Sequence, residues 1–387
     1  MIKMILEKFK NNIEQNLNVY KQIVLDLYEH PEIGNQEFES SKKLVHLIEK
    51  YGFHIEYPYL CPTGFKAEYQ SKKPGETIGF LCEYDALPEI GHGCGHNLIC
   101  TMSIAAAVAL KTIIDEIGGK IILFGTPAEE NFGGKIAFAE HHAFDGVDLA
   151  LMLHPSNVNR IGGRTNALYP LRFEFFGKNA HAANPYDGRS ALDAAVQTYM
   201  GISMLRQFAL PNSYIHGVIK KGGEAANIIP AYAMMEYYFR APQMKYAKHL
   251  ANQALKIAQG AAMQFGVMVK ESIYECPYDD KKINYTLCAK LKEIYENVGI
   301  TNVLDVCEVP SGSSDIGAVS YLCPTIEGQI QIADTCVTAH SKEMAMATIS
   351  DCGTEAIVKG GMSLAKLAYD FITDHEFSKK VKEEFLK

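Results

Sequence analysis

The segment EYDALPEIGHGCGHN, residues 83–97, concentrates on one loop several side chains that can bind a metal ion. Cys94 and His96 stand two positions apart with a glycine between them, so a sharp turn could direct both toward one ion or two neighbouring ions. Asp85 could accept a hydrogen bond from the second ring nitrogen of a ligating histidine and fix its tautomer. His92 is either an outer member of the same group or an ordinary loop residue. The alternative for Cys94 and His96 is a buried cysteine and a structural histidine.

A second chemical signal is the acidic pair Glu129–Glu130 in GTPAEENFGGK. Adjacent residues never share one face of a helix or strand, so the two carboxylates naturally serve different partners. One could bind a metal while the other exchanges a proton with water. The alternative is a solvated acidic turn at a helix N-terminus, which the helix dipole stabilises.

Two isolated histidines complete the set of candidate ligands. His154 ends an apolar segment just before a proline, and His340 lies in the hydroxyl-rich segment DTCVTAHS. Either one alone is typical of a structural histidine. Together with Cys94, His96 and Glu130 they provide, on separate loops, the N, S and O ligands that a two-ion hydrolytic site uses. The spacing does not fit a CxxC zinc finger.

The segments that precede these residues predict an α/β domain. TIGFLCEY, KIILFGT and VDLALMLHP are short, nearly continuous apolar runs, and they alternate with helical segments such as LICTMSIAAAVALKTIIDEI. Such strands are typical of a largely parallel sheet that is covered on both faces. In sheets of this kind, ligands gather at the carboxyl ends of the strands, and the candidate residues follow or end the predicted strands.

Beyond these segments the pattern changes to that of a second domain. YPLRFEFFG alternates, with Leu171, Phe173 and Phe175 on one face and charged residues on the other, which predicts a half-buried strand. The following segments continue in the order β-α-β-β-α-β of a small complete domain. We therefore expect a catalytic α/β domain in two parts around an inserted domain, with the catalytic parts at 1–167 and 277–387 and the insertion at 168–276.

The composition excludes several classes of function. A net charge of −8 argues against nucleic acid binding, which requires a basic face. ENFGGK lacks the spacing of a phosphate-binding loop, because Ile136 follows Lys135. The first 32 residues have the pattern of an amphipathic helix rather than a signal peptide, and no segment has the roughly 18 to 20 continuous apolar residues of a membrane span. Ten cysteines without a compact framework are typical of free thiols, so we expect a cytoplasmic protein.

Four segments, in the same order along the chain, resemble the M20 metallopeptidases: EYDALPEIGHGCGHN, TPAEENFGGK, GKNAHAANPYDGRSALDAA and GGEAANIIPAYAMMEYYFRA. The sequence is most similar to the amidohydrolase branch, which contains p-aminobenzoyl-glutamate hydrolase and the aminoacylase-1-like dipeptidases. The resemblance spans almost the whole chain. It implies a zinc-exopeptidase-like catalytic domain with a mostly parallel sheet, and a ferredoxin-like lid domain that mediates dimerisation.

The resemblance also implies a role for each candidate residue. Glu129 would be the general acid/base, and His181 would reach the partner subunit's active site and stabilise the tetrahedral oxyanion. Asn227 and Arg240 match substrate-binding positions, with the arginine taking a carboxylate. The implied metal ligands, with Asp85 beside them, are Cys94, His96, Glu130, His154 and His340.

The chain departs from one common M20 pattern, because Glu83-Tyr84-Asp85 stands where many members carry His-x-Asp. We expect two divalent metal ions per subunit, zinc or manganese, with cobalt and nickel as alternatives. The expected partners are a small-molecule substrate and a second copy of the chain, with no nucleic acid and no membrane.

The expected reaction is hydrolysis of an amide bond in a small carboxylate-bearing substrate by water that the metal activates. N-acyl amino acids, dipeptides and p-aminobenzoyl-glutamate-like compounds fit this description. The alternatives are a cysteine-dependent hydrolase that uses Cys94, and a non-catalytic binding protein on the same fold.

Overall fold

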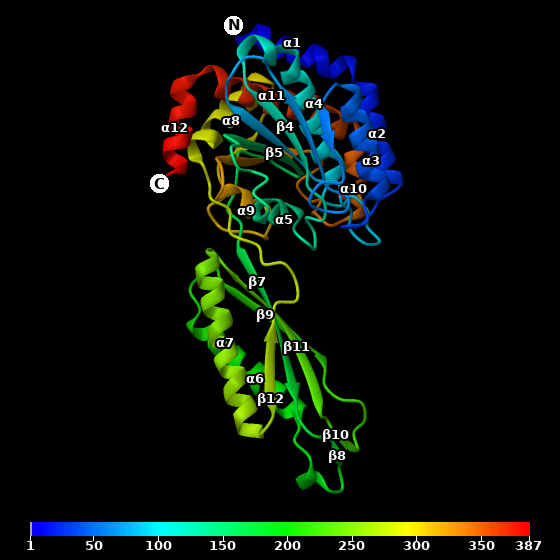
Figure 1. Cartoon of the computed structure of the whole chain (residues 1–387), viewed down its shortest axis with the longest axis vertical. Coiled ribbons are helices and arrows are strands. Elements are labelled where there is room, and N and C mark those ends of the chain that lie inside the picture. Colours follow the sequence, from blue (N-terminus) through cyan, green and yellow to red (C-terminus); the bar gives the residue numbers. More distant parts are fainter. Residues whose placement is uncertain (1) are drawn as a thin grey trace. The chain divides into compact units, whose positions relative to one another are not determined.

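The computed structural model describes residues 2–387, and the chain forms two compact units, each with its own core (Figure 1). Unit 1 extends to Arg164 and includes Lys281–Glu308 and Asp315–Lys387, and unit 2 comprises Thr165–Asp280 and Val309–Ser314. The short segment Val309–Ser314 therefore belongs to unit 2, although the sequence pattern placed it in the second part of the catalytic domain.

Unit 1 is built from helices and from strands of a single sheet. The helices are α1 (Ile2–Gln15), α2 (Leu17–Glu29), α3 (Phe38–Lys50), α4 (His96–Ile117), α5 (Gly134–Glu140), α8 (Tyr285–Asn297), α9 (Ile316–Ser320), α10 (Lys342–Thr348), α11 (Asp351–Thr373) and α12 (His375–Phe385). The strands are β1 (His54–Glu56), β2 (Phe65–Gln70), β3 (Thr77–Cys82), β4 (Lys120–Gly125), β5 (Leu149–Ser156), β6 (Asn159–Arg160), β13 (Val303–Leu304) and β14 (Thr325–Gln331).

The strands form an eight-stranded sheet in the order β1-β2-β4-β3-β5-β14-β6-β13. The four central strands are parallel, since β3 pairs in parallel with β4 and β5, and β14 pairs in parallel with β5. β1 and β2 extend one side of the sheet in antiparallel pairing. The prediction of a mostly parallel sheet is confirmed. Because the central strands share one direction, their carboxyl ends meet at the same edge.

Alternate residues of the central strands enter two hydrophobic cores on opposite faces of the sheet. Ile78 and Phe80 of β3 belong to the larger core, which α4 and α11 cover. Leu81 belongs to the smaller core, together with Phe138 of α5 and Ile316 of α9. Burial on both faces explains why these strands are nearly continuous apolar runs in the sequence.

Helix α4 lies at the centre of the larger core. Its 22 residues are long and apolar enough, by length and composition, to cross a membrane, but 89% of the most apolar window is buried inside the unit. Small residues let α11 approach closely, because a Cβ added to Gly361 would lie 3.2 Å from the Cβ of Ala105. The apolar composition of α4 therefore reflects packing on both the sheet and α11.

The first 32 residues form two helices where the sequence pattern predicted one. α1 and α2 are separated at Asn16, whose side-chain amide donates to the carbonyl oxygen of Asn12 at 2.8 Å. A local hydrogen bond of this kind competes with the helical pattern of the backbone.

Unit 2 contains one four-stranded antiparallel sheet, a short separate ribbon and two long helices. Its elements are β7 (Ala167–Phe176), β8 (Ala180–His181), η1 (Pro185–Asp187), α6 (Ala191–Leu205), η2 (Arg206–Phe208), β9 (Tyr214–Lys221), β10 (Ile228–Ile229), β11 (Tyr232–Ala241), α7 (Met244–Phe265) and β12 (Met268–Ser272). The sheet order is β12-β7-β11-β9, and β8 pairs with β10. The long elements follow one another as β7-α6-β9-β11-α7-β12.

The sheet of unit 2 is apolar on the face that α6 and α7 cover and polar on the other face. Leu171, Phe173 and Phe175 are buried in the core of this unit, as the alternation of the sequence predicted. On the opposite face, the guanidinium of Arg172 lies 2.7 Å from the carboxylate of Glu236, its cross-strand neighbour. The pattern is that of a half-buried antiparallel sheet.

Candidate metal and catalytic site

The candidate ligands of unit 1 follow or end its four parallel central strands. The loop with Cys94 follows β3, and the pair Glu129–Glu130 follows β4. His154 lies near the end of β5, opposite Gln329 of β14, and His340 follows β14. Since the strands are neighbours in the order β4-β3-β5-β14, separate loops meet at one edge of the sheet (Figure 1).

The structure brings all five predicted metal ligands together with Glu129. One donor atom from each residue lies within 4.8 Å of the others in three overlapping groups: Cys94–His96–His154, Cys94–Glu130–His340 and His96–Glu129–Glu130. We refer to these six residues as the donor cluster. Because the three groups share members, the donor cluster is continuous.

His96 is held in place by the glycine before it and by Asp85. Gly95 has a φ of +80° at the N-cap of α4, and a Cβ there would lie 2.9 Å from Pro155, so glycine is required. Nδ1 of His96 lies 2.9 Å from Oδ1 and 3.0 Å from the carbonyl oxygen of Asp85. These acceptors fix a proton on Nδ1 and direct Nε2 toward the donor cluster.

Asp85 also orients a second member of the cluster. Its Oδ2 accepts a hydrogen bond from the backbone N–H of Glu130 at 3.0 Å. Burial raises the pKa of Asp85, but the charge and hydrogen bond of His96 and the Glu130 N–H together lower it below the usual value. The carboxylate form, which can accept all of these hydrogen bonds, is therefore the stable one.

The two isolated histidines are oriented by backbone groups. Nδ1 of His154 lies 2.6 Å from the carbonyl oxygen of Pro155, so Nε2 is the nitrogen with a lone pair for a metal. His340 has a φ of +61°, and its backbone N–H donates to the carbonyl oxygen of Gly93 at 3.0 Å. Its Nε2 lies 3.7 Å from Oε2 of Glu130. A strained residue held in this way is typical of a functional site.

The chemistry of the donors fits a divalent transition metal, since thiolate, imidazole and carboxylate are its usual ligands. Among residues 2–387, Nε2 of His96 and Oε1 of Glu130 are buried and have no hydrogen-bond partner. Burial lowers the pKa of His96, but Asp85 raises it well above its usual value, so Nε2 carries a proton that a metal cation would replace. Buried polar atoms of this kind, all directed at one place, are what a metal site requires.

Cys94 supports a metal site and argues against a cysteine hydrolase. Burial raises the pKa of its thiol to about 12, although His96 lowers it. The thiolate therefore needs a cation close by, and a metal supplies one. A cysteine nucleophile requires the thiolate without such help, which this environment disfavours.

Glu129 has the environment expected of a carboxyl group that exchanges protons. It is partly buried, and burial together with the carboxylates of Glu83 and Asp315 raises its pKa well above the usual value. The charge of His96 acts in the opposite direction. A raised pKa brings a carboxyl group closer to the range in which it can serve as both acid and base.

A buried ion network, which sequence reasoning missed, lies beside the cluster. Nζ of Lys135 lies 2.5 Å from Oε1 of Glu83 and 2.6 Å from Oδ1 of Asp315, and all three side chains are at most 1% exposed. Oε2 of Glu83 in turn lies 3.4 Å from Nε2 of His96. Lys135 was noticed only as the end of a glycine-rich stretch, and Asp315 had no distinguishing sequence signal.

The other three predicted site residues lie on unit 2. His181 and Asn227 are neighbours, because β8 pairs with β10 and the N–H of Ala182 donates to the carbonyl oxygen of Asn227 at 2.9 Å. Arg240 lies near the opposite end of β11, where Nη1 donates to the hydroxyl of Ser313 at 2.9 Å. The unit thus carries these residues at two separate places (Figure 1).

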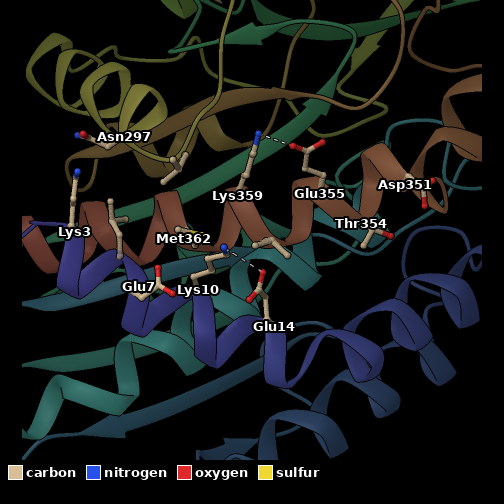
Figure 2. A pocket seen from close by; sticks show the side chains of 13 residues that line it. Lys3, Glu7, Lys10, Glu14, Asn297, Asp351, Thr354, Glu355, Lys359 and Met362 are labelled. Atoms are coloured by element: carbon tan, nitrogen blue, oxygen red, sulfur yellow. Dashed lines mark ion pairs between the residues drawn. The ribbon is translucent and has the colours of Figure 1, made fainter.

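A groove of about 590 Å³ lies elsewhere on unit 1, between α1, α11 and the end of α8 (Figure 2). Its charged side chains pair with one another, with Lys359 2.6 Å from Glu355 and Lys10 3.8 Å from Glu14. None of the residues that line it belongs to the donor cluster. Charges that already pair at a seam between helices are typical of helix packing, so we assign the chemistry to the donor cluster.

Comparison with known proteins identifies similar sequences. The profile of Peptidase family M20/M25/M40 matches residues 76–368. The Xaa-Arg dipeptidase of Mus musculus is 34% identical over 375 residues, which cover 93% of this chain and 87% of that protein. One of the two polypeptides of the p-aminobenzoyl-glutamate hydrolase of Escherichia coli (strain K12) is 34% identical over 296 residues, which cover 70% of this chain and 60% of that polypeptide.

Solved structures share the fold at low sequence identity. An aminobenzoyl-glutamate utilization protein from Klebsiella pneumoniae has a TM-score of 0.70 and 19% identity, covering 92% of this chain and 98% of its own. The Bacillus subtilis YXEP protein, described as a dinuclear metal binding peptidase of the M20 family, has a TM-score of 0.64 and 19% identity, covering 92% of this chain and 99% of its own.

Proposed function

The chain belongs to Peptidase family M20/M25/M40, and we propose that this member cleaves the amide bond of dipeptides or N-acyl amino acids whose released amino acid bears a free carboxylate. Metal-dependent amide hydrolysis is the activity of the chain. The names Xaa-Arg dipeptidase, p-aminobenzoyl-glutamate hydrolase and N-acetyl-L-cysteine deacetylase share one feature, an amide whose amine side is an amino acid. That shared feature supports the proposed substrate class.

The observation that carries the proposal is the donor cluster itself. Its three groups of ligand atoms, each within 4.8 Å, combine one thiol, three imidazoles and two carboxylates. We propose two divalent ions per subunit, because Cys94 and Glu130 each belong to two groups and can serve neighbouring positions. Zinc or manganese is our first expectation, with cobalt and nickel as alternatives, and a thiolate ligand favours zinc over manganese.

Glu129 is the proposed general acid/base of the reaction. It takes a proton from the attacking water and delivers it to the nitrogen of the leaving amine. The burial and neighbouring carboxylates that raise its pKa let Glu129 hold this proton between the two transfers. Bound divalent ions supply Lewis-acid polarisation of the scissile carbonyl and acidify water.

Arg240 is the proposed binding residue for the substrate carboxylate. A guanidinium can hold a carboxylate through two parallel hydrogen bonds, which also fixes its orientation. The hydrogen-bond partner of Arg240 in unit 2 is the neutral hydroxyl of Ser313, which does not compensate its positive charge.

His181 and Asn227 are proposed to serve the active site of a partner subunit, with the His181 side chain donating to the developing oxyanion. The distance along unit 2 supports this assignment. Tyr232 and Arg240 are eight residues apart on β11, or about 27 Å at the usual rise of a strand. His181 and Asn227 lie beyond the Tyr232 end, whereas a dipeptide spans only about 7 Å. One small substrate therefore cannot contact both ends of the same unit.

Unit 2 presents an apolar surface that fits the proposed homodimer. Val196, Met200 and Met204 follow one another at i, i+4 and i+8 on α6, and Phe208 continues the row. Their exposed fractions range from 42% to 75%. β9 is an edge strand of the same sheet, and an unpaired edge can add a strand from a second copy. Contiguous apolar surface beside an open edge is typical of a protein interface.

We further propose that unit 1 is the catalytic domain and unit 2 a ferredoxin-like lid and dimerisation domain. The antiparallel order β12-β7-β11-β9, with both long helices on one face, supports that description of unit 2. Ten free cysteines support a reducing compartment, so we propose a cytoplasmic enzyme.

The first experiment combines elemental mass spectrometry with a substrate panel. The panel contains N-acyl amino acids, dipeptides and the same dipeptides with an amidated C-terminus. We expect bound transition metal, turnover that a chelator abolishes and metal restores, and no turnover of the amidated substrates. Full activity in chelated, metal-free protein would refute the metal mechanism, and equal turnover of amidated dipeptides would refute the proposed substrate class.

The acid/base role is tested by Glu129→Gln, with Glu140→Gln as the matched control. Glu140 is an exposed carboxylate on the following helix, so its replacement makes the same chemical change away from the cluster. We expect Glu129→Gln to lower kcat by about 10² to 10⁴-fold with metal content unchanged, and the control to leave kcat unchanged. A Glu129→Gln enzyme with wild-type kcat would exclude the assignment.

The trans role of His181 is tested by mixing inactive His181→Ala and Glu129→Ala proteins under conditions of subunit exchange. A hybrid dimer keeps one complete site, so random exchange restores about one quarter of the wild-type activity. No recovery after demonstrated exchange would place His181 outside the partner's site.

A further inference from the structure

Glu37 is a buried carboxylate close to the acidic pair but outside the segment that the family profile matches, residues 76–368. It is the N-cap residue of α3, and its side chain is fully buried. Among residues 2–387, no lysine, arginine or histidine pairs with it, and burial raises its pKa to about 7. A buried charge without a counter-ion is costly, so its hydrogen bonds indicate what it does.

The two carboxylate oxygens of Glu37 have different partners. Oε2 accepts from the hydroxyl of Thr63 at 2.7 Å, and Oε1 accepts from the backbone N–H of Ala128 at 2.9 Å. Ala128 directly precedes Glu129 and has a φ of +61°, a left-handed conformation that a residue with a Cβ adopts at a cost of about 1 to 2 kcal/mol. The hydrogen bond from Ala128 to Glu37 stabilises this strained conformation.

The turn that carries Glu129 is held at both of its flanking peptide groups. On one side, the N–H of Ala128 donates to Glu37, and on the other side the N–H of Glu130 donates to Oδ2 of Asp85 at 3.0 Å. The carbonyl oxygen of Ala128 also accepts the N–H of Gly133 at 2.8 Å, which closes the turn. Fixing the peptide groups before and after Glu129 fixes the direction of its Cα–Cβ bond.

The chain before Glu37 packs against the same turn. A Cβ added to Gly34 would lie 2.9 Å from both Cα and Cβ of Ala128. The carbonyl oxygen of Glu32 accepts the N–H of Ala86 at 2.8 Å, so the segment also contacts the loop after β3. Residues 32–37 thus contact both loops that carry the acidic and metal-binding side chains.

We infer that Glu37 is a positioning residue of the hydrolysis, which holds Ala128 in its left-handed conformation and thereby aims the Glu129 carboxylate at the reacting atoms. The inference rests on the proposed role of Glu129 as general acid/base. Glu37 acts through the backbone of Ala128 and contacts neither substrate nor metal.

The test compares Glu37→Ala, Glu37→Gln and the matched control Glu32→Gln. The Glu32 carboxylate accepts the N–H of Ser40 at 2.7 Å, so the control disturbs the same end of α3 without touching Ala128. Glutamine keeps an oxygen for the Ala128 N–H, and the Thr63 hydroxyl can turn to accept from its amide. We expect Glu37→Ala to lower kcat about 10- to 100-fold with KM within threefold, because small displacements of a reacting group have effects of this size. Glu37→Gln keeps at least about one third of the wild-type kcat, and Glu32→Gln keeps all of it.

Two further measurements separate positioning from general damage. Elemental analysis shows unchanged metal content in every variant, and hydrogen–deuterium exchange of the peptide spanning 126–134 becomes faster in Glu37→Ala but not in Glu37→Gln. If Glu37→Ala does not fold, Glu37→Asp takes its place, because the carboxylate is kept but its reach is shortened by one methylene. Wild-type kcat in the folded alanine or aspartate variant, or an equal loss of kcat in the glutamine variant, overturns the inference.

The variant Glu129→Gln distinguishes failure of the inference from failure of the proposed function. An inactive Glu129→Gln enzyme beside a fully active Glu37→Ala enzyme refutes only the positioning role. A fully active Glu129→Gln enzyme refutes the acid/base assignment, and the positioning role falls with it.

Discussion

Replacing Lys135 with methionine tests how unit 1 stabilises the negative charge beside the donor cluster. Lys135 is fully buried, and its ammonium group lies within 2.6 Å of carboxylate oxygens of both Glu83 and Asp315. Methionine has a similar length and no charge, so it keeps most of the packing and removes the cation. Asp315 keeps the hydrogen bond from the backbone N–H of residue 135, which is 2.9 Å long.

The expected cost follows from leaving two buried carboxylates without their cation. Removing one partner of a buried ion pair typically costs about 3 to 5 kcal/mol of unfolding free energy, because the remaining charge is desolvated and unpaired. The double variant Lys135→Met/Asp315→Asn is more stable than Lys135→Met by about 1 to 3 kcal/mol, since one of the two carboxylates becomes a neutral amide.

The measurement is urea unfolding of metal-free protein, followed by far-ultraviolet circular dichroism because the chain has no tryptophan. A lower midpoint at unchanged slope reports the loss of stability. Lys42→Met is the matched control, since Lys42 forms a 2.7 Å ion pair with Glu39 in which both side chains are more than half exposed. We expect that control to change stability by less than about 0.5 kcal/mol. A cost below about 1 kcal/mol for Lys135→Met, or strict additivity in the double variant, would refute the reasoning.

Three further outcomes are expected. Cys94→Ser weakens metal binding at least about 10-fold in a chelator competition assay, whereas Cys100→Ala, at a buried cysteine outside the donor cluster, leaves it unchanged. Arg240→Met raises KM at least about 10-fold for substrates with a free carboxylate and leaves metal content unchanged; an unaltered KM would remove Arg240 from the substrate site. Burial raises the pKa of Glu37 from 4.5 to about 7, so the folded state holds a proton that the unfolded state has lost between these values, and the stability this provides is present below pH 4.5 and lost as pH rises through 7. Glu37→Gln does not titrate, so its stability relative to wild type increases by up to about 3 kcal/mol from pH 4 to pH 8 in unfolding experiments, and a pH-independent difference would contradict the assignment.

Several parts of the site were predictable because they depend on local sequence. Gly95 has the left-handed φ that the Cys94-Gly-His96 spacing requires, and His96 begins α4 directly after it. The apolar strands were visible as continuous runs, and parallel strands bring their carboxyl ends to one edge whatever the loops contain. Local patterns and one topological rule were therefore enough to expect Glu130 and His154 at one edge.

The partners that support these residues could not be predicted, because they come from distant segments and have ordinary local contexts. Asp315 reaches Lys135 across 180 positions of sequence. Glu37 reaches Ala128 across 91 positions, and nothing in NQEFES marks that glutamate as different from its neighbours. A buried carboxylate is recognised by its three-dimensional partners, and a single sequence does not display them.

The charge around the donor cluster explains why these distant partners are needed. Six carboxylates gather at or beside it, four of them at most 1% exposed: Glu37, Glu83, Asp85, Glu129, Glu130 and Asp315. Lys135 is the buried lysine that pairs with two of them, and it leaves most of this negative charge uncompensated. The proposed pair of divalent ions would contribute four positive charges, close to what the remaining carboxylates and the Cys94 thiolate require. The same carboxylates that attract the metals therefore orient the ligands, through Asp85, and the proton-transferring group, through Glu37, so charge compensation and geometry are properties of one buried network.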